Sequence, residues 1–376
     1  MLPSRERVAE LDLDRRLFEL RTVFAGLAGG EPDGIWAASG RVNIIGEHTD
    51  YNDGLVLPIA IDRQSLAAVR RREDDSIRCW SRQDTDEAWE TYPRAVARAL
   101  ADAGLPVGGF DLVIDSDVPS GGGLSSSAAL ECSVALALAG EQFDRPTLAR
   151  ICQRAENFYV GAPTGIMDQM AALLGVAGHA LLLDCRDLTT ENVPFPLDGL
   201  TLLVIDTKAV HEHSESGYGD RRKACEQAAR ALGVDSLRDA APDAVEALDE
   251  PLRRRARHVV AEIARVRSAV ALLREGRTRD LGPLLDASHA SLRDDFEVSV
   301  DELNVAVDEA RAAGALGARM TGGGFGGSAI ALAEQDAVDA VREAVTRAYA
   351  ARDWTAPDIF AVTPADAASR LDEGDA

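Results

Sequence analysis

Residues 119–130 read Pro119-Ser120-Gly121-Gly122-Gly123-Leu124-Ser125-Ser126-Ser127-Ala128-Ala129-Leu130, and they follow the apolar run Phe110–Val118. This order of a strand, a glycine run, a serine run and an apolar helix predicts an anion site. The first N–H groups of a helix lack partners within the helix and lie at the positive end of its dipole. Glycines let phosphate groups lie against the backbone, and a serine hydroxyl can ligate Mg²⁺. A flexible linker before a serine-capped helix is the alternative, but a linker seldom separates a clear strand from a clear helix.

The chain around this loop mixes strands and helices without a regular alternation. Apolar patterning predicts strands at Gly34–Ala38, Ile59–Val69, Phe110–Asp115, Leu181–Asp184, Leu202–Ile205, Ala318–Thr321, Ala329–Leu332 and Ile359–Val362. Helical periodicity predicts helices at Ala128–Gly140, Thr147–Tyr159, Gly165–Leu174, Asp220–Leu232, Leu252–Arg274, Val300–Ala313 and Ala337–Ala350. The mixture favours an α+β fold over a doubly wound sheet. We expect one domain over residues 1–200 and a second over 201–376, because long helices follow residue 200.

Composition excludes several classes of protein. The chain has 376 residues with 40 Lys plus Arg and 63 Asp plus Glu, a net charge of −23 that disfavours nucleic acid and anionic membranes as partners. Its first twenty residues are charged and helix-like rather than a signal peptide, and no run reaches the roughly 18 apolar residues of a membrane span. The five scattered cysteines are typical of reduced thiols. We therefore expect a soluble cytoplasmic protein, and a monomer by default.

The lysines exclude two familiar nucleotide sites. Lys208 and Lys223 are the only lysines, and neither follows a glycine. The P-loop pattern GxxxxGK[ST] is therefore absent, as is the strand lysine of protein kinases. A protein of this sequence that uses ATP would have to hold the phosphates with another loop, such as residues 119–130.

A second motif, Gly40–Tyr51, reads Gly-Arg-Val-Asn-Ile-Ile-Gly-Glu-His-Thr-Asp-Tyr. Carboxylates accept hydrogen bonds from hydroxyls, and a histidine can donate or accept, so the cluster suits a sugar or another polyol. A solvated loop with a surface ion pair is the alternative for any one of these residues. Five such side chains in so short a stretch favour a binding site.

The third motif, Met320–Gly327, reads Met-Thr-Gly-Gly-Gly-Phe-Gly-Gly between two expected strands. It predicts either a wide hairpin loop or a second glycine surface that closes over phosphates. Asp168 lies in an otherwise apolar helical turn, where a carboxylate is costly to bury without a purpose. Tyr218 falls in an apparently polar loop. His211 and His213 could suggest a metal, but without a third ligand we interpret them as loop histidines.

Together the three motifs resemble the GHMP small-molecule kinases, and Gly40–Tyr51 is similar to the signature of the galactose-phosphorylating members. The resemblance implies a two-domain fold, with an N-terminal ribosomal-protein-S5-like domain, a C-terminal ferredoxin-like domain and the active site in the cleft between them. It also implies ATP-dependent phosphorylation of D-galactose at the C1 hydroxyl, giving α-D-galactose 1-phosphate and ADP at the start of the Leloir pathway. The expected cofactors are ATP and Mg²⁺.

The resemblance assigns roles position by position. Asp168 matches the catalytic base, and Arg41 matches the arginine that neutralises charge near the reacting hydroxyl. The substrate-binding positions would be Arg41, Glu47, His48, Thr49, Asp50, Gly165, Asp168 and Tyr218. The nucleotide positions would be Gly121, Gly122, Gly123, Leu124, Ser125, Ser126 and Ser127, with Ser81 by a looser alignment. The Mg²⁺ ligands would be Ser127 and Glu156.

Three alternatives stay open at this stage. A related sugar, such as N-acetylgalactosamine, arabinose or a uronic acid, could be the substrate, because one side chain can enlarge a pocket. A non-catalytic sensor of sugar and ATP is less favoured, since such relatives lose part of the serine run that is intact here. A structural scaffold would leave the glycine loops and Asp168 unexplained.

Overall fold

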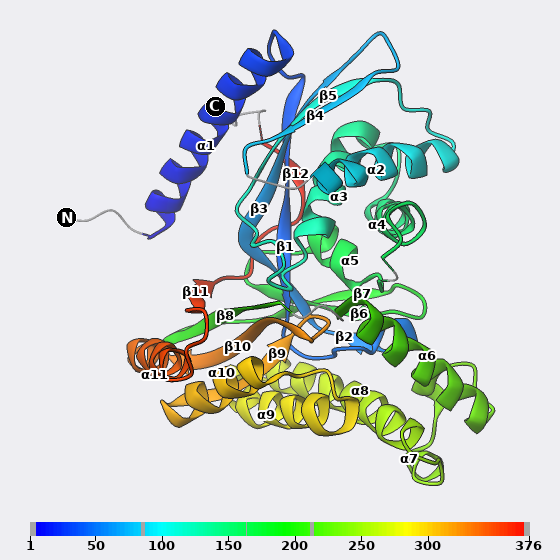
Figure 1. Ribbon diagram of the computed structural model, residues 1–376, viewed down its shortest axis with the longest axis vertical. Coiled ribbons are helices and arrows are strands. Elements are labelled where there is room, and N and C mark those ends of the chain that lie inside the picture. Colours follow the sequence, from blue (N-terminus) through cyan, green and yellow to red (C-terminus); the bar gives the residue numbers. More distant parts are fainter. Residues whose placement is uncertain (1–4, 84–86, 163, 211–213, 372–376) are drawn as a thin grey trace.

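The computed structural model describes residues 5–83, 87–162, 164–210 and 214–371. Its largest sheet has five strands in the order β12-β1-β3-β5-β4, drawn in the upper half of Figure 1. Neighbouring strands are antiparallel except β4 and β5, which are parallel. The strands are β1 (Gly34–Asn43), β3 (Pro58–Arg71), β4 (Ile77–Ser81), β5 (Phe110–Ser116) and β12 (Ser369–Arg370).

Helices cover both faces of this sheet. One face carries α2 (Thr91–Asp102), α3 (Ser126–Ala139), α4 (Arg145–Arg154) and α5 (Met167–Leu174), and the other carries α1 (Arg5–Ala28) (Figure 1). Because both faces are covered, nearly every residue of β1 is buried, and the alternation of a half-exposed strand is missing. The sheet is therefore a rigid support for the segments that leave its strands.

The second half is built on a four-stranded antiparallel sheet in the order β11-β8-β10-β9. Its strands are β8 (Leu200–Val210), β9 (Ala315–Thr321), β10 (Gly326–Glu334) and β11 (Asp358–Val362). The helices of this half are α6 (Ser214–Leu232), α7 (Pro242–Val245), α8 (Leu252–Arg274), α9 (Gly282–Ser291), α10 (Asp301–Ala312) and α11 (Val338–Ala350), and α8 to α10 lie beneath the sheet in Figure 1. A small sheet of β2 (Leu55–Val56), β6 (His179–Asp184) and β7 (Thr190–Pro194) lies between the halves.

The two halves share one hydrophobic core. Val42, Ile44 and Ile45, which end and follow β1, belong to the same buried cluster as Val266 of α8 and Ile330 of β10. The chain also returns to the first sheet at its end, where β12 pairs with β1. The α+β class is confirmed. We keep the domain division near residue 200 as a proposal, and it falls at the start of β8.

Several sequence expectations differ from the structure in instructive ways. Tyr218 lies in helix α6 rather than in a polar loop. The helix expected over Thr147–Tyr159 is instead α4 followed by a π-helical turn, Ala155–Val160. In both cases tertiary contacts order the segment: the ring of Tyr218 lies against that of His48, and Glu156 in the π-helical turn accepts a hydrogen bond from Ser127. His211 and His213 lie outside the described residues.

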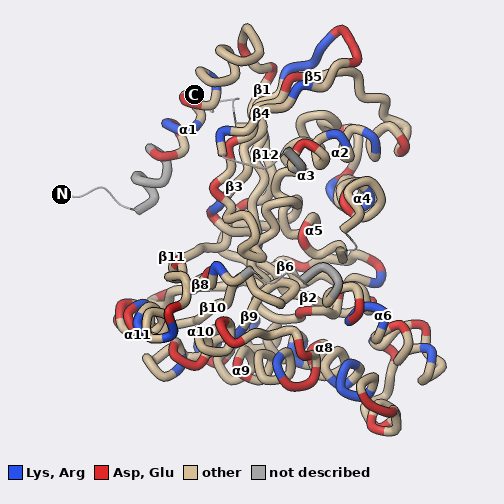
Figure 2. Tube along the Cα trace, in the orientation of Figure 1, with Lys and Arg blue, Asp and Glu red and all other residues tan. Residues whose placement is uncertain are grey.

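None of the helices within the described ranges is both long enough and apolar enough to cross a membrane. Charged residues are spread over the outer helices, and a dense run of both signs follows the turn between β3 and β4 (Figure 2). At this edge the fully buried carboxylate of Asp111 pairs with Arg70 (2.8 Å), Arg72 (3.2 Å) and Arg78 (2.6 Å). Burial raises the pKa of Asp111, but hydrogen bonds from Arg78 and Arg70 outweigh it and leave this pKa below its ordinary value.

Asp111→Asn should lower the free energy of unfolding by about 1–3 kcal/mol at neutral pH, because it weakens charged hydrogen bonds in a buried site. The folded-state pKa of Asp111 is lower than the unfolded one, so this stabilisation is present above about pH 4 and is lost as the pH falls further. Urea unfolding at pH 7 and pH 3.5 measures both effects. Asp74→Asn is the matched control, because that exposed carboxylate also pairs with Arg72. Equal effects of the two variants at pH 7 would contradict the prediction.

Candidate active site

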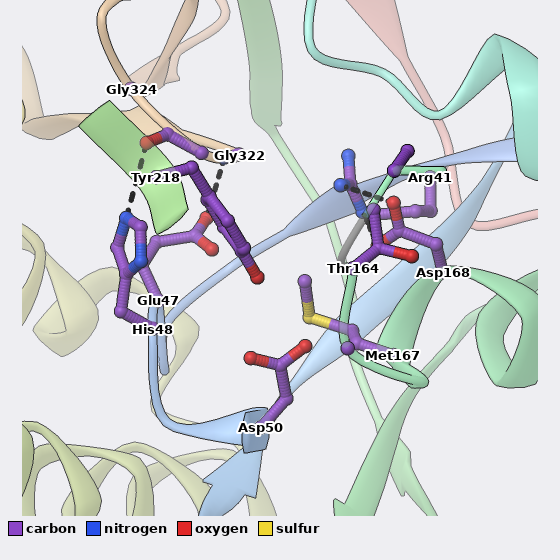
Figure 3. Close-up of a pocket in the computed structure, with 13 residues that line it drawn as sticks. Arg41, Glu47, His48, Asp50, Thr164, Met167, Asp168, Tyr218, Gly322 and Gly324 are labelled. Atoms are coloured by element: carbon purple, nitrogen blue, oxygen red, sulfur yellow. Dashed lines mark hydrogen bonds and ion pairs between the residues drawn. The ribbon is translucent and has the colours of Figure 1, made fainter. Parts of the chain in front are cut away.

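A cavity of about 260 Å³ lies between the two halves of the molecule. This volume is below the roughly 300 Å³ at which pockets for drug-sized ligands begin, so the cavity suits a small molecule. Figure 3 shows Glu47 and His48 on one side of the cavity and Arg41, Thr164 and Asp168 on the other. The residues that line the cavity are Arg41, Glu47, His48, Asp50, Ala162, Thr164, Gly165, Met167, Asp168, Tyr218, Gly322, Gly323 and Gly324.

Arg41 and Asp168 form a two-pronged ion pair at one end of the cavity. Arg41 Nε donates to Asp168 Oδ1 at 2.7 Å, and Arg41 Nη2 donates to Oδ2 at 2.8 Å. Arg41 Nη1 donates to the carbonyl of Gly123 at 2.6 Å, and the hydroxyl of Ser125 donates to Asp168. Burial lowers the pKa of Arg41, but the charges of Asp168 and Glu47 outweigh it and leave the pKa raised. The pair is thus fixed both to the cavity and to the glycine-serine loop.

The glycine-serine loop ends at the first turn of α3, as the sequence predicts. Gly121 and Gly123 have φ values of +74° and +71°, and Ser125 has φ of +61°, a region that favours glycine. Ser125 precedes the helix, but its side chain makes no cap there, because its hydroxyl bonds to Asp168 instead. Within the described ranges no side-chain cap occupies the first N–H groups of α3, so these groups can serve an anion.

The loop between β9 and β10 (residues 322–325) and the first residues of β10 pack backbone to backbone on the glycine-serine loop. A Cβ on Gly322 would lie 3.0 Å from the carbonyl oxygen of Gly123, and one on Gly327 would lie 3.4 Å from that of Gly122. Ser328 Oγ donates to the Gly122 carbonyl at 2.6 Å. The third motif therefore contacts the glycine-serine loop, and its glycines 322–324 also line the cavity.

Glu47 and His48 hold this second glycine loop from the cavity side (Figure 3). Glu47 Oε1 accepts from the N–H of Gly322 at 2.8 Å and from the hydroxyl of Thr321 at 3.1 Å. His48 Nε2 lies 3.1 Å from the carbonyl oxygen of Gly323, and Nδ1 lies 2.8 Å from the hydroxyl of Tyr51. Burial lowers the pKa of His48 to about 3, so the ring is neutral. Since a carbonyl can only accept, Nε2 carries the proton and Nδ1 accepts from Tyr51.

Asp50 lies on the opposite wall against Gly165. A Cβ on Gly165 would lie 1.6 Å from Asp50 Oδ2, so only glycine fits beside this carboxylate. Burial, followed by the charge of Asp168, raises the pKa of Asp50 to about 7. Asp50 therefore changes its charge close to neutral pH.

The structure brings most of the predicted substrate residues together, with one exception. Tyr218 reaches the cavity from α6, and its ring lies 5.4 Å from that of His48 and 5.5 Å from that of Tyr51. Thr49 does not line the cavity. Its buried hydroxyl donates to the carbonyls of Gly46 and Leu55, so Thr49 stabilises the turn between these two residues rather than facing the cavity.

Ser127 and Glu156, the expected Mg²⁺ ligands, are adjacent. Ser127 Oγ donates to Glu156 Oε1 at 2.9 Å, and Thr164 and Gln169 donate to Oε2 at 2.7 and 2.8 Å. Burial raises the pKa of Glu156. No group of three or more His, Cys, Asp or Glu side chains that could hold a metal occurs in the described part of the chain. Two hard oxygen ligands still fit Mg²⁺, which usually takes one or two carboxylates and completes its shell with phosphates and water.

Ser81 lines a second cavity, of about 170 Å³, which also contains Ser126 and Ser127 of the glycine-serine loop. Trp89 and Tyr92 add two aromatic rings to this cavity, and no pattern in the sequence predicts either as a site residue. Neither aromatic lies in a recognisable motif, so only their place in the same cavity as Ser81 of β4 and Ile114 of β5 identifies them. The second cavity adjoins the helix start at which phosphates would bind.

Family models match three segments of the chain. Residues 22–71 match the galactokinase galactose-binding signature, residues 91–176 the GHMP kinases N terminal domain, and residues 269–351 the GHMP kinases C terminal domain. A galactokinase of Streptomyces coelicolor is 52% identical over 93% of this chain and 97% of its own length. A galactokinase of Homo sapiens is 42% identical over 88% of this chain and 90% of its own length.

Solved structures agree with these sequence matches. The galactokinase of Lactococcus lactis, solved in complex with galactose, is 34% identical, and the match covers 94% of this chain and 100% of that chain with a TM-score of 0.89. A mevalonate kinase, 17% identical with a TM-score of 0.63, shares the fold over 88% of this chain and 98% of its own. The motifs, the shared cavity and these relatives lead to one conclusion: the chain belongs to the galactokinase family of the GHMP kinases.

Proposed function

We propose that this protein transfers the γ-phosphoryl group of ATP to the C1 hydroxyl of D-galactose. The main support is the position of the Arg41–Asp168 pair, which is bonded to the glycine-serine loop through Gly123 and Ser125 and also lines the cavity. A donor held at the loop and an acceptor held in the cavity would therefore meet at these two side chains. The domain division at residue 200, a monomeric state and a cytoplasmic location are further proposals.

The proposed reaction forms a bond between the C1 oxygen of the sugar and the γ-phosphorus. The bond between that phosphorus and the oxygen that bridges it to the β-phosphorus breaks, and ADP leaves. The hydroxyl proton passes to the carboxylate of Asp168, which the two bonds from Arg41 hold in a fixed orientation. Because the transition state of phosphoryl transfer is loose, positioning and charge neutralisation contribute most of the rate.

Arg41 would neutralise charge that develops between the sugar oxygen and the phosphoryl group. A cation about 4 Å from such a charge is worth roughly 4 kcal/mol at an effective dielectric constant near 20. The phosphates of ATP would lie against Gly121–Ser127 at the start of α3. The adenine base of ATP would lie in the second cavity, which Ser81 lines. Ser127 and Glu156 would hold Mg²⁺, whose chemistry there would be to neutralise the β- and γ-phosphate oxygens.

The sugar would occupy the cavity lined by Glu47, Asp50 and Tyr218. Glu47 Oε2 has no hydrogen-bond partner within the described ranges, so it can accept from a sugar hydroxyl. Both ring nitrogens of His48 already have partners. We therefore propose that His48 contacts the sugar through its ring and serves mainly to hold Gly323.

The direct test is ADP release from the purified protein with MgATP and single sugars. We expect release with D-galactose and little release with N-acetylgalactosamine, arabinose, a uronic acid or no sugar. Faster ADP release with another of these sugars would contradict the proposal that D-galactose is the substrate. If no sugar causes ADP release but the protein binds ATP measurably, a non-catalytic sensor of the same ligands would be favoured instead.

Asp168→Asn should lower kcat by about 10²–10⁴, the usual contribution of a general base. ATP affinity should stay nearly unchanged, because Asp168 is the proton acceptor and is not one of the residues proposed to hold the phosphates. Steady-state kinetics and nucleotide binding measure the two effects. Asp184→Asn is the matched control, since Asp184 makes the same two-pronged pair with Arg238 and has side-chain exposure of 21%, against 22% for Asp168. Wild-type turnover of Asp168→Asn would remove Asp168 from the mechanism.

The pH dependence of the galactose KM should reflect the ionisation of Asp50. With a pKa of about 7, Asp50 is protonated below neutral pH and ionised above it. An ionised carboxylate accepts stronger hydrogen bonds from hydroxyls, so KM should fall as the pH rises from about 6 to about 8. Asp50→Asn should raise KM and abolish this trend, whereas Asp53→Asn, on the same turn but outside the cavity, should keep it. An unchanged pH profile in Asp50→Asn would assign the trend to another group.

A further inference from the structure

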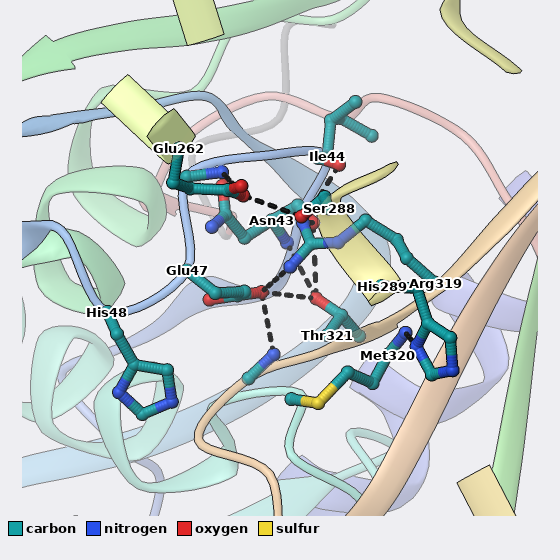
Figure 4. Close-up of polar contacts among 12 residues, drawn as sticks. Asn43, Ile44, Glu47, His48, Glu262, Ser288, His289, Arg319, Met320 and Thr321 are labelled. Carbon is teal, nitrogen blue, oxygen red and sulfur yellow. Dashed lines mark hydrogen bonds and ion pairs between the residues drawn. The ribbon is translucent and has the colours of Figure 1, made fainter. Parts of the chain in front are cut away.

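Arg319 of β9 is the largest fully buried side chain described, and it does not line the cavity. Figure 4 shows its guanidinium beneath the segment that follows β1. Nη1 donates to the carbonyls of Asn43 at 3.2 Å and Ile44 at 3.0 Å, and Nη2 lies 3.3 Å from Glu47 Oε1. The side chain thus joins the strand before the second glycine loop to the segment that carries Glu47.

Stability alone is a weak reason for a charge in this position. Arg319 is 0% exposed, and its Nε and Nη2 atoms make no hydrogen bond within the described residues. Taking a guanidinium out of water is costly, and replacing a buried ion pair by apolar residues of similar volume is often neutral or stabilising. A buried arginine with unused donors is therefore better explained by the group that it orients.

That group is Glu47 rather than the second buried carboxylate nearby. Glu262 has its own cation, because Arg265 Nε donates to its Oε2 at 2.6 Å, and it also accepts from Ser288 Oγ at 2.6 Å. Glu47 is 2% exposed and pairs with Arg319 within the described ranges. His48 and His258, on either side, are neutral because burial lowers their pKa values to about 3 and about 4.

The contacts of Glu47 divide its two oxygens between two tasks. Oε1 faces Arg319, Thr321 and Gly322, while the carboxylate also lines the cavity. Arg319 also fixes the backbone four and three residues before Glu47, through the carbonyls of Asn43 and Ile44. Arg319, a side chain outside the cavity, thus contacts both the carboxylate of Glu47 and the backbone that leads to it.

We propose that Arg319 is a positioning residue for sugar recognition, which holds Glu47 so that Oε2 is presented to one hydroxyl of the sugar. The inference rests on the proposed function, since it takes the ligand of the cavity to be galactose. It assigns to Arg319 a selectivity role that acts through Glu47 alone. The loss of Arg319 should therefore change the recognition of one hydroxyl rather than of the whole substrate.

The test compares galactose with a set of monodeoxygalactoses in the wild type, Glu47→Gln, Arg319→Met and the double variant. In the wild type, kcat/KM should fall most for the analogue that lacks the hydroxyl bound by Glu47. Glu47→Gln and Arg319→Met should each lower galactose kcat/KM by about 10- to 100-fold, the usual effect of losing a hydrogen bond to a charged group. Each should also reduce discrimination against the same analogue, and the double variant should be no worse than the more impaired single variant.

ATP binding and thermal melting separate positioning from general damage. ATP binding should change less than twofold in Arg319→Met. Arg70→Met is the matched control, because Arg70 likewise joins a backbone carbonyl, that of Ala28, to a buried carboxylate, Asp111. It should lower the melting temperature without changing selectivity among the sugars. Arg319→Lys keeps the charge but lacks the planar guanidinium with its several donors. It should lose selectivity at the same hydroxyl by a smaller factor than Arg319→Met.

Three results would overturn the inference. Arg319→Met could lower kcat/KM equally for galactose and every analogue, the double variant could multiply the two single effects, or Arg319→Lys could keep full wild-type selectivity. If Arg319→Met does not fold, Arg319→Lys alone decides between the outcomes. The failure of the proposed function would look different, because the wild type itself would then not use galactose.

Discussion

The close backbone contact between the two glycine loops is the constraint on which the active site depends. Gly122 and Gly123 meet Gly322 and Gly327 at distances at which a Cβ would already touch a carbonyl oxygen. One loop leads from β5 to α3, and the other connects β9 and β10, so the contact joins the two sheets. Because Glu47 and His48 bond to Gly322 and Gly323, the sugar wall is placed relative to the phosphate loop by the same contact.

The charges of the site are arranged in pairs that leave specific oxygens available. Arg41 compensates Asp168 at the reacting end, and Arg319 compensates Glu47 beneath the cavity. Asp50 has no such cation in the described ranges, and burial raises its pKa instead. Because Arg41 and Arg319 orient the other two carboxylates, the cavity combines two oriented acceptors with one whose charge changes close to neutral pH.

Local motifs made much of this site predictable from the sequence, whereas long-range contacts did not. Asp168 could be singled out because a carboxylate within an apolar helical turn is costly, and the glycine-serine loop because its order matches a strand, an anion site and a helix. Arg319 gave no such signal, since one arginine in an apolar strand has no local pattern and its partners lie about 275 residues earlier in the chain. Tyr218 and β12 were misjudged or missed for the same reason, because tertiary packing rather than local sequence orders them.

The strongly acidic chain has a consequence for how a nucleotide can bind. At a net charge of −23 the protein as a whole repels a triphosphate, so attraction must come from groups within a few ångströms. Arg41 is already largely compensated by Asp168, and Lys208 is paired with Asp206 beside Gly122. The start of α3 supplies only partial positive charge. The charge balance therefore favours ATP that carries its own cation, which agrees with placing Ser127 and Glu156 beside the same helix start.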